Sequence, residues 1–343
     1  MIDLKSMLPE ELEAYLISLG EPKFRAKQIF SWLSKGVSSF AEMSNIPQTL
    51  KEKLSADAYI DSLHLLRRQV NGLDGTTKYL WELSDGNAVE TVVMRYEHGL
   101  TVCISSQVGC RQGCAFCAST IGGLVRNLTA SEMLDEVLYS QLDQGEEISN
   151  IVIMGIGEPL DNYDAVMKFL RLINHPDGLN IGMRHISLST CGLTERIRDL
   201  AKEDLQITLA LSLHAPDDET RTKLMPANRG RGIENVISAC EDYFQTTGRR
   251  ITFEYAMINE VNDSAEQAEK LARLARRVKA HINLIPLNHV EERQFMPSSS
   301  ERMKAFCKIL SDRGANYTIR RSLGGDVDAS CGQLRRKREL ERI

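Results

Sequence analysis

The 343-residue chain contains no long apolar run. Because no stretch of about 18 consecutive apolar residues occurs, we expect no membrane-spanning helix and no contact with a membrane. The amino terminus, Met1–Lys5, also lacks the charged and then apolar pattern of a secretory signal peptide. No low-complexity segment or short-period repeat is visible. With 42% hydrophobic and 26% charged residues, the composition is that of an ordinary globular protein, and we expect a cytoplasmic one.

Positive charge is not in excess either. The chain has 42 Lys and Arg against 47 Asp and Glu, a formal net charge of −5, which argues against indiscriminate binding to nucleic acid. A local basic face is still compatible with this balance. The best candidate is the run from Arg335 to Arg338, close to the carboxyl terminus.

The chain divides into stretches with different periodicities. Residues 8–55 have a roughly helical spacing, so residues 1–60 are predicted to form a small helical domain. Residues 76–83 and 89–94 alternate with a period of two around Ser84–Asn87, which predicts a β-hairpin in an extension at 61–99. From residue 100, apolar strand candidates alternate with helical stretches. The strands are expected at 101–105, 150–154, 184–189, 206–213, 251–258, 281–287 and 316–321, and the helices near 130–144, 162–174, 194–202, 233–246, 264–279 and 299–313.

This alternation predicts an α/β fold built from βαβ units around a parallel sheet. Six such units make a partial (β/α)6 barrel over residues 100–323. A flat, doubly wound sheet is the alternative, and periodicity alone does not separate the two. Residues 324–343 are expected to form a carboxyl-terminal loop and a basic tail.

Three of the eight cysteines lie within eight residues of one another. Cys110, Cys114 and Cys117 have the spacing C-x3-C-x2-C, and nearby glycines let the loop turn tightly. A closed structural zinc site and an electron-transfer iron–sulfur cluster each take four ligands. Three thiolates therefore favour a 4Fe–4S cluster with one open iron. A zinc site completed from elsewhere and a chance grouping are the competing interpretations.

Chemically distinctive residues follow the predicted strands. In parallel α/β folds, sites form at the carboxyl ends of the strands, so these residues predict one shared site. Glu158 with nearby backbone groups could hold an ammonium group, and the hydroxyl and amide side chains could bind a carboxylate, a ribose or an adenine edge. The residues are Gly157, Glu158, Ser189, Ser212, Leu213, His214 and Asn288.

Two further cysteines are candidates for chemistry. Cys331 lies in a glycine-bearing segment after the last strand, where a thiol could be a nucleophile, although composition alone favours an incidental exposed cysteine. Cys103 lies on the strand that leads into the cysteine loop and faces either the barrel or the core. Cys191, Cys240 and Cys307 are expected to be packing residues.

Together these motifs resemble the radical S-adenosylmethionine (radical SAM) enzymes, whose hallmark is C-x3-C-x2-C. More narrowly, the chain resembles the RlmN/Cfr family of RNA adenine methyltransferases, and the resemblance covers nearly all of it. Asn288-His289 and residues 323–326 depart from the family pattern. The motifs that carry the resemblance are Val89–Val92, Cys103–Cys110, Arg126–Leu128, Gly157–Pro159, Ser212–His214, Leu224–Pro226 and Ala329–Leu334.

The resemblance implies a role for each candidate residue. Cys110, Cys114 and Cys117 correspond to the ligands of a 4Fe–4S cluster whose open iron binds the amino and carboxylate groups of S-adenosylmethionine. Cys331 corresponds to the cysteine that carries the methyl group, Cys103 to the cysteine that resolves the RNA adduct by forming a disulfide with it, and Glu90 to the proton acceptor. The positions that bind S-adenosylmethionine correspond to Gly157, Glu158, Ser189, Ser212, Leu213, His214 and Asn288.

The implied reaction is methylation of carbon 2 of an adenosine in 23S rRNA and in certain tRNAs. An aromatic ring carbon is not a nucleophile, so ordinary polar methyl transfer fails and a radical route is needed. We expect a monomer that takes electrons from an external donor such as flavodoxin. Pro159 favours carbon 2 over carbon 8, the position that Cfr modifies. Two different classes of protein are also compatible with the cysteine motif: a radical SAM activase or dehydrogenase, and a non-catalytic zinc or iron–sulfur RNA-binding protein.

Overall fold

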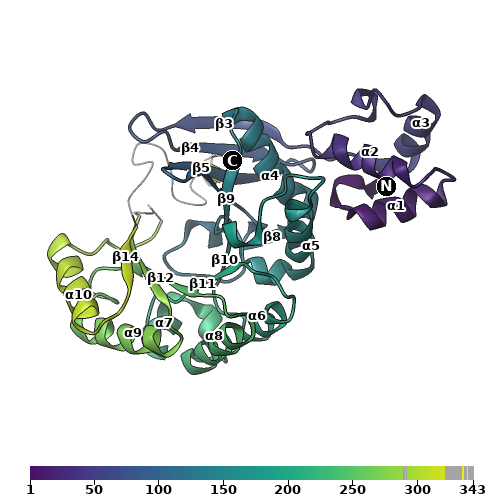
Figure 1. The fold of residues 1–343 in the computed structure, drawn as a ribbon. Coiled ribbons are helices and arrows are strands. Elements are labelled where there is room, and N and C mark those ends of the chain that lie inside the picture. Colours follow the sequence, from purple (N-terminus) through teal and green to yellow (C-terminus); the bar gives the residue numbers. More distant parts are fainter. Residues whose placement is uncertain (289, 291, 321–333, 336–337, 339–343) are drawn as a thin grey trace.

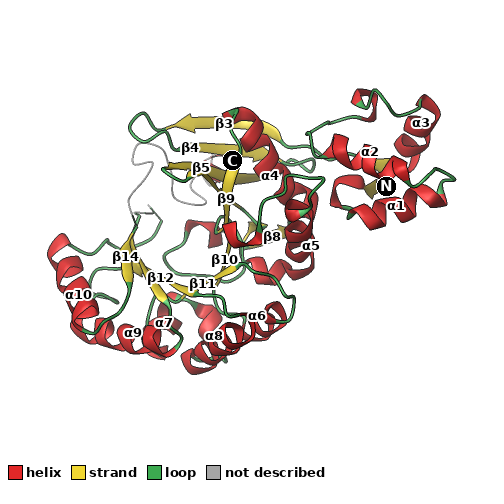
Figure 2. Ribbon diagram, in the orientation of Figure 1, coloured by secondary structure: helices red, strands yellow, loops and turns green. Residues whose placement is uncertain are grey.

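The computed structural model describes residues 1–288, 290, 292–320, 334–335 and 338. A group of helices at the amino terminus lies beside a curved sheet that is surrounded by further helices (Figures 1 and 2). Among these residues, no helix combines the length and the apolar composition that a membrane span requires. The helices are α1 Pro9–Ser18, α2 Phe24–Leu33, α3 Gln48–Asp57, α4 Ala130–Gln144, α5 Tyr163–Asn174, α6 Thr194–Ala201, α7 Asp218–Leu224, α8 Ile233–Thr247, α9 Ala265–Arg277 and α10 Ser300–Asp312. The strands are β1 Ile2–Asp3, β2 Ala58–Tyr59, β3 His64–Val70, β4 Thr77–Glu82, β5 Ala88–Tyr96, β6 Gly99–Ile104, β7 Gln107–Gly109, β8 Leu124–Asn127, β9 Ile148–Ile153, β10 Ile186–Thr190, β11 Thr208–Ser212, β12 Ile251–Met257, β13 His281–Pro286 and β14 Tyr317–Ile319.

The main sheet has ten strands in the order β14-β13-β12-β11-β10-β9-β6-β5-β4-β3. From β6 to β14 neighbouring strands are parallel, and their order follows the chain without reversal. A doubly wound sheet reverses its order at a switch point, so the flat alternative is excluded. The helices lie on the convex side of the curved sheet (Figure 1), which confirms the predicted partial (β/α)6 barrel.

The predicted hairpin is present as the antiparallel pair β4–β5, but it is part of a larger structure. Strand β3, which the sequence did not suggest, pairs with β4 on its other side. Its side chains are mostly exposed, so it lacks the apolar alternation that marks a half-buried strand. Strand β5 also pairs antiparallel with β6, so the extension continues the barrel sheet.

The pairing of β5 with β6 decides which side chains face the barrel interior. Alternate residues of a strand point to opposite faces of the sheet. Thr91 donates a hydrogen bond to Glu136 of α4, so it faces the helix layer. Val92 therefore faces the concave side, and Cys103, directly opposite Val92, faces that side with it. Cys103 therefore faces the barrel interior and not the core beneath the helices.

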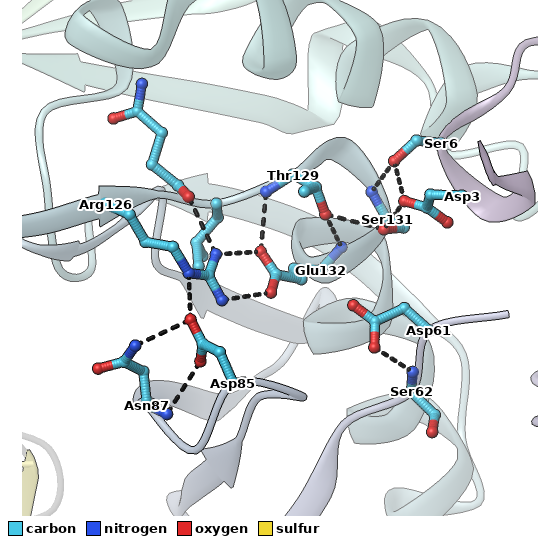
Figure 3. Close-up of polar contacts among 12 residues, drawn as sticks. Asp3, Ser6, Asp61, Ser62, Asp85, Asn87, Arg126, Thr129, Ser131 and Glu132 are labelled. Carbon is cyan, nitrogen blue, oxygen red and sulfur yellow. Dashed lines mark hydrogen bonds and ion pairs between the residues drawn. The ribbon is translucent and has the colours of Figure 1, made fainter. Parts of the chain in front are cut away.

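Polar contacts connect the amino-terminal helices to helix α4. Lys5 Nζ lies 3.0 Å from both carboxylate oxygens of Asp135 and donates to the Asp61 carbonyl oxygen at 2.7 Å. Figure 3 shows a second connection, in which the Asp3 carboxylate accepts hydrogen bonds from the hydroxyls of Ser6 and Ser131, both at 2.5 Å. The amino-terminal residues are therefore held against the first helix of the barrel.

The Lys5–Asp135 pair gives a prediction about stability. Both side chains are buried, so Lys5→Met leaves a buried carboxylate without its cation and should lower the free energy of unfolding by about 3–5 kcal/mol at pH 8. Burial raises the pKa of Asp135 to about 7, so the carboxyl can take up a proton at pH 5 and the loss should be smaller there. Urea unfolding at both pH values measures the difference.

A matched control is Lys23→Met, which removes an exposed partner of Glu13. Its effect on the free energy of unfolding should be much smaller than that of Lys5→Met, because solvent screens such pairs. Equal effects of the two substitutions would contradict a special role for the buried pair.

Candidate functional site

Two cavities lie at the carboxyl ends of the barrel strands and share part of their walls. The larger has a volume of about 300 Å³ and the smaller about 150 Å³. Since six residues line both, they form one connected site. The shared residues are Phe116, Cys117, Met154, Ser189, Ser212 and His214.

Most of the residues that the sequence singled out meet in this site. The larger cavity also contains Cys103 and Asn288 in its wall. Leu213 is fully buried behind the site, and its amide donates to the Glu254 carbonyl oxygen at 3.1 Å. Neither cavity has Glu90 in its described lining, and Cys331 lies outside the described residues. The smaller cavity is lined in addition by Cys110, Cys114, Gly157 and Glu158.

The cysteine loop is held in place through its backbone. Gly109 has φ 78°, and a Cβ there would collide with the carbonyl oxygen of Gly123. The Thr120 hydroxyl donates to the carbonyl oxygens of Cys114 at 3.1 Å and Cys117 at 3.0 Å. The Ala115 amide donates to the carbonyl oxygen of Leu224, the last residue of α7, at 2.8 Å. The loop is thus held in place by hydrogen bonds to its backbone.

The donor set suits an iron–sulfur cluster. In the described part of the chain, no three His, Cys, Asp or Glu side chains are grouped to hold a single metal ion. Cysteine thiolates are the usual ligands of iron–sulfur clusters, and each of them binds a different iron. Burial raises the pKa of the Cys110 thiol to about 12 and raises that of Cys114 as well, so metal binding must release protons.

Glu158 is a buried carboxylate in the wall of the smaller cavity. It accepts hydrogen bonds from the amides of Cys191 at 2.7 Å and Leu160 at 3.1 Å, one on each oxygen. Burial raises its pKa, and these amides act in the opposite direction. Gly157 precedes it at φ 111°, where a Cβ would lie 2.6 Å from the Cβ of Gln107. The tight turn therefore requires glycine, and it fixes where the carboxylate lies.

His214 has a defined tautomer. Its Nδ1 accepts a hydrogen bond from the Ala256 amide at 3.0 Å, so Nε2 carries the hydrogen when the ring is neutral. The backbone is in the left-handed region at φ 53°, and Asn262 stabilises this turn by donating to the His214 carbonyl oxygen at 2.7 Å. Burial and the charge of Arg221 lower the pKa of His214 to about 3. The ring is thus a neutral hydrogen-bond donor at the cavity.

The sequence did not single out two charged residues of the larger cavity, Glu254 and Arg320. Both also line a further cavity of about 380 Å³ on the concave face of the sheet. Asn283 donates to Glu254 at 3.3 Å, and burial raises the pKa of this carboxyl. A charged residue between Phe253 and Tyr255, within an apolar strand, was the signal that could have identified Glu254.

Glu90 lies on the concave face but is covered. Its Oε2 pairs with Lys78 Nζ at 2.9 Å, and both side chains are almost completely buried. Its Oε1 accepts a hydrogen bond from the Arg335 amide at 2.7 Å. The sequence missed Lys78, although a lysine within the apolar strand β4 was a usable signal.

The environment of His214 predicts part of the pH dependence of folding. The unfolded chain binds a proton at this histidine below about pH 6.5, whereas the folded protein does so only near pH 3. Stability from this residue is therefore lost as the pH falls from 6.5 towards 3, by about 2 kcal/mol between pH 6.5 and 5. Urea unfolding of the wild type and of His214→Gln measures the effect. The variant should lose less stability over this range, and parallel curves would contradict the assignment.

Two family models match the chain. The model of the radical SAM superfamily matches residues 104–275, and that of the ribosomal RNA large subunit methyltransferase N-terminal domain matches residues 2–60. Two relatives carry the name "Probable dual-specificity RNA methyltransferase RlmN". The protein from Alkaliphilus metalliredigens is 49% identical, and the alignment covers 98% of this chain and 96% of the relative. That of Lachnoclostridium phytofermentans is 51% identical, covering 98% and 94%.

A solved structure agrees with these relatives. The radical SAM methyltransferase from Sphaerobacter thermophilus matches with a TM-score of 0.91 and 43% sequence identity, covering 97% of this chain and 99% of its own. Both the sequence and the complete fold are therefore shared with methyltransferases of this type. The chain belongs to the RlmN family of radical SAM RNA methyltransferases.

Proposed function

We propose that the chain methylates carbon 2 of an adenosine in 23S rRNA and in certain tRNAs, and that the methyl group passes through Cys331. The observation that carries the proposal is the connected site, which brings Cys103 together with the three-cysteine loop and the strand-end residues. The relatives are named dual-specificity RNA methyltransferases, which supports an RNA substrate. Pro159 supports carbon 2 through the family resemblance, because Cfr proteins, which modify carbon 8, tend to have alanine at this position.

In this proposal Cys110, Cys114 and Cys117 hold a 4Fe–4S cluster. When bound, this group supplies the one-electron chemistry that S-adenosylmethionine needs in order to start a radical reaction. The chain itself binds and orients the cofactor. Glu158 offers a carboxylate to its amino group, and hydrogen-bonding groups for its carboxylate, ribose or adenine come from Ser189, Ser212, His214 and Asn288. Gly157 and Leu213 contribute through the backbone.

Cys103 and Glu90 are proposed to complete the reaction on the RNA side of the site. Cys103 opens into the larger cavity, where its thiol could resolve the adduct. Glu90 would accept the proton, and Lys78 compensates the negative charge of its carboxylate. Arg335 contacts Glu90 and follows Cys331 by four residues, so the chain is long enough to bring Cys331 to this part of the site.

The proposed organisation has four parts: an accessory domain at 1–60, the extension at 61–99, the barrel at 100–323, and the loop and tail at 324–343. We also propose that the protein is a cytoplasmic monomer that receives electrons from an external donor such as flavodoxin. The tail includes Arg335 and Arg338 from the basic run, and Leu334 packs against Leu80 and Ala88 of the extension.

An anaerobic assay tests the reaction. The reconstituted protein is incubated with S-adenosylmethionine, a reductant and rRNA or tRNA, and digested RNA is examined by mass spectrometry. We expect 2-methyladenosine from the wild type and none from Cys331→Ala. Cys307→Ala, on the remote helix α10, is the matched control and should retain activity. Exclusive 8-methyladenosine, or full activity of Cys331→Ala, would overturn the proposal.

The role of Glu90 predicts a second result. Loss of a proton-transfer group typically lowers kcat by about 10²–10⁴-fold, so we expect a decrease of this size for Glu90→Gln. Glu146→Gln, which removes an exposed partner of Arg95, should leave kcat unchanged. Unaltered kcat in Glu90→Gln would remove Glu90 from the reaction and leave the remaining assignments intact.

A further inference from the structure

Helix α7 carries a fully buried arginine to which neither the sequence nor the reaction assigns a role. Arg221 has 0% relative exposure, and it is the largest of the fully buried side chains among the described residues. No carboxylate in that part of the chain lies within ion-pair distance of its guanidinium. Burying a cation costs several kcal/mol unless a negative partner compensates it. The position of this charge therefore needs an explanation.

The hydrogen-bond partners of Arg221 are all neutral. Its NH2 donates to the carbonyl oxygens of Cys191 at 2.6 Å and Ser212 at 3.3 Å, and its Nε donates to that of Leu213 at 3.2 Å. Its NH1 donates to the Asn228 side-chain oxygen at 2.6 Å. Asn228 in turn donates to the exposed carboxylate of Asp218 at 2.8 Å. The carboxylate of Asp218 is thus connected to Arg221 only through the neutral side chain of Asn228.

This charge lies directly behind the cysteine loop. The end of α7 holds the loop through the hydrogen bond from the Ala115 amide to Leu224, and Cys114 packs with Leu224 and Met225. Met225 lines the smaller cavity together with Cys191, whose carbonyl oxygen Arg221 holds. The guanidinium is therefore bonded directly to the wall of the smaller cavity, which Cys114 also lines.

The negative partner would arrive with the cluster. Three thiolates bring negative charge to the smaller cavity, and reduction by one electron from an external donor adds another. The potential of an iron–sulfur cluster depends on its net charge and on nearby hydrogen bonds and burial. A fixed cation in a water-poor environment stabilises the more negative form. Its charge is permanent, because an arginine does not lose its proton in a protein.

We propose that Arg221 stabilises the reduced form of the cluster held by Cys110, Cys114 and Cys117, and so makes that cluster easier to reduce. The inference rests on the proposed function, since it needs a cluster in this loop. The hydrogen bonds of Arg221 go to three backbone carbonyls and Asn228, so it is a positioning residue that acts on the cluster through its charge. Its hydrogen bonds to the ends of β10 and β11 keep that charge in place.

The test is the midpoint potential of the cluster in anaerobically reconstituted, full-length protein. The titration uses dithionite and redox mediators, without S-adenosylmethionine or RNA, and the reduced cluster is followed by electron paramagnetic resonance. Arg221→Gln should lower the equilibrium constant for one-electron reduction about tenfold, or about 59 mV. Arg221→Lys keeps the charge and should retain most of the wild-type potential.

Lys223→Gln is the matched control on the same helix. It removes one positive charge from an exposed pair with Glu219 and should leave the potential unchanged. The double variant Asn228→Asp with Asp218→Asn exchanges an amide and a carboxylate, so the total charge is conserved. It places the negative charge against Arg221 and should lower the potential without removing the arginine.

The outcomes separate the two proposals. If the wild type binds no cluster, the proposed function fails. If the wild type binds a cluster and Arg221→Gln leaves its midpoint potential unaltered, only the present inference is overturned. The inference is also overturned if Arg221→Lys lowers the midpoint potential as much as Arg221→Gln does. Should Arg221→Gln fail to fold, the double variant decides, and an unaltered potential in it overturns the inference.

Discussion

The site depends on one buried carboxylate, that of Glu136 on α4. It accepts hydrogen bonds from the Thr91 hydroxyl at 2.6 Å and from the Ser105 amide at 3.0 Å. Ser105 in turn donates through its hydroxyl to the Glu90 carbonyl oxygen at 2.8 Å and accepts from the Ile156 amide at 3.2 Å. Since an unpartnered buried carboxylate is costly, these contacts hold α4, β5, β6 and the loop after β9 in one arrangement.

That arrangement brings together groups that are distant in the sequence. Glu90 and Cys103 lie on adjacent strands, and the cysteine loop begins a few residues after Ser105. Gly155 lets the two loops touch, because a Cβ there would lie 2.6 Å from the Ile104 carbonyl oxygen. The close approach of backbone to backbone therefore determines the shape of the smaller cavity.

Much of the fold was predictable because it is encoded in local patterns of hydrophobic periodicity and residue spacing. The alternation of apolar strands with helices predicted the parallel sheet, and the cysteine spacing predicted the type of enzyme, which the relatives confirm. Strand β3 escaped prediction because its exposed side chains carry no periodic signal. Lys78 and Glu254 each carried a signal, a charge within an apolar strand, but only the structure shows what each of them faces. Arg221 escaped because it lies in a polar helical sequence, Asp218–Leu224, in which nothing marks it as buried. The individual site roles remain proposals, including that of Cys331, which lies outside the described residues.

The sequence by itself determined the alternation of strands and helices in the barrel, the three-thiol motif and the family. These are local or linear properties, which neighbouring residues encode through periodicity and spacing. Only the tertiary structure decided that the sheet curves without reversing its order, that Cys103 faces the barrel interior, and that Glu90 pairs with Lys78. Strand register and long-range packing set these features. A one-residue shift in the pairing of a strand would move each of its side chains to the opposite face of the sheet.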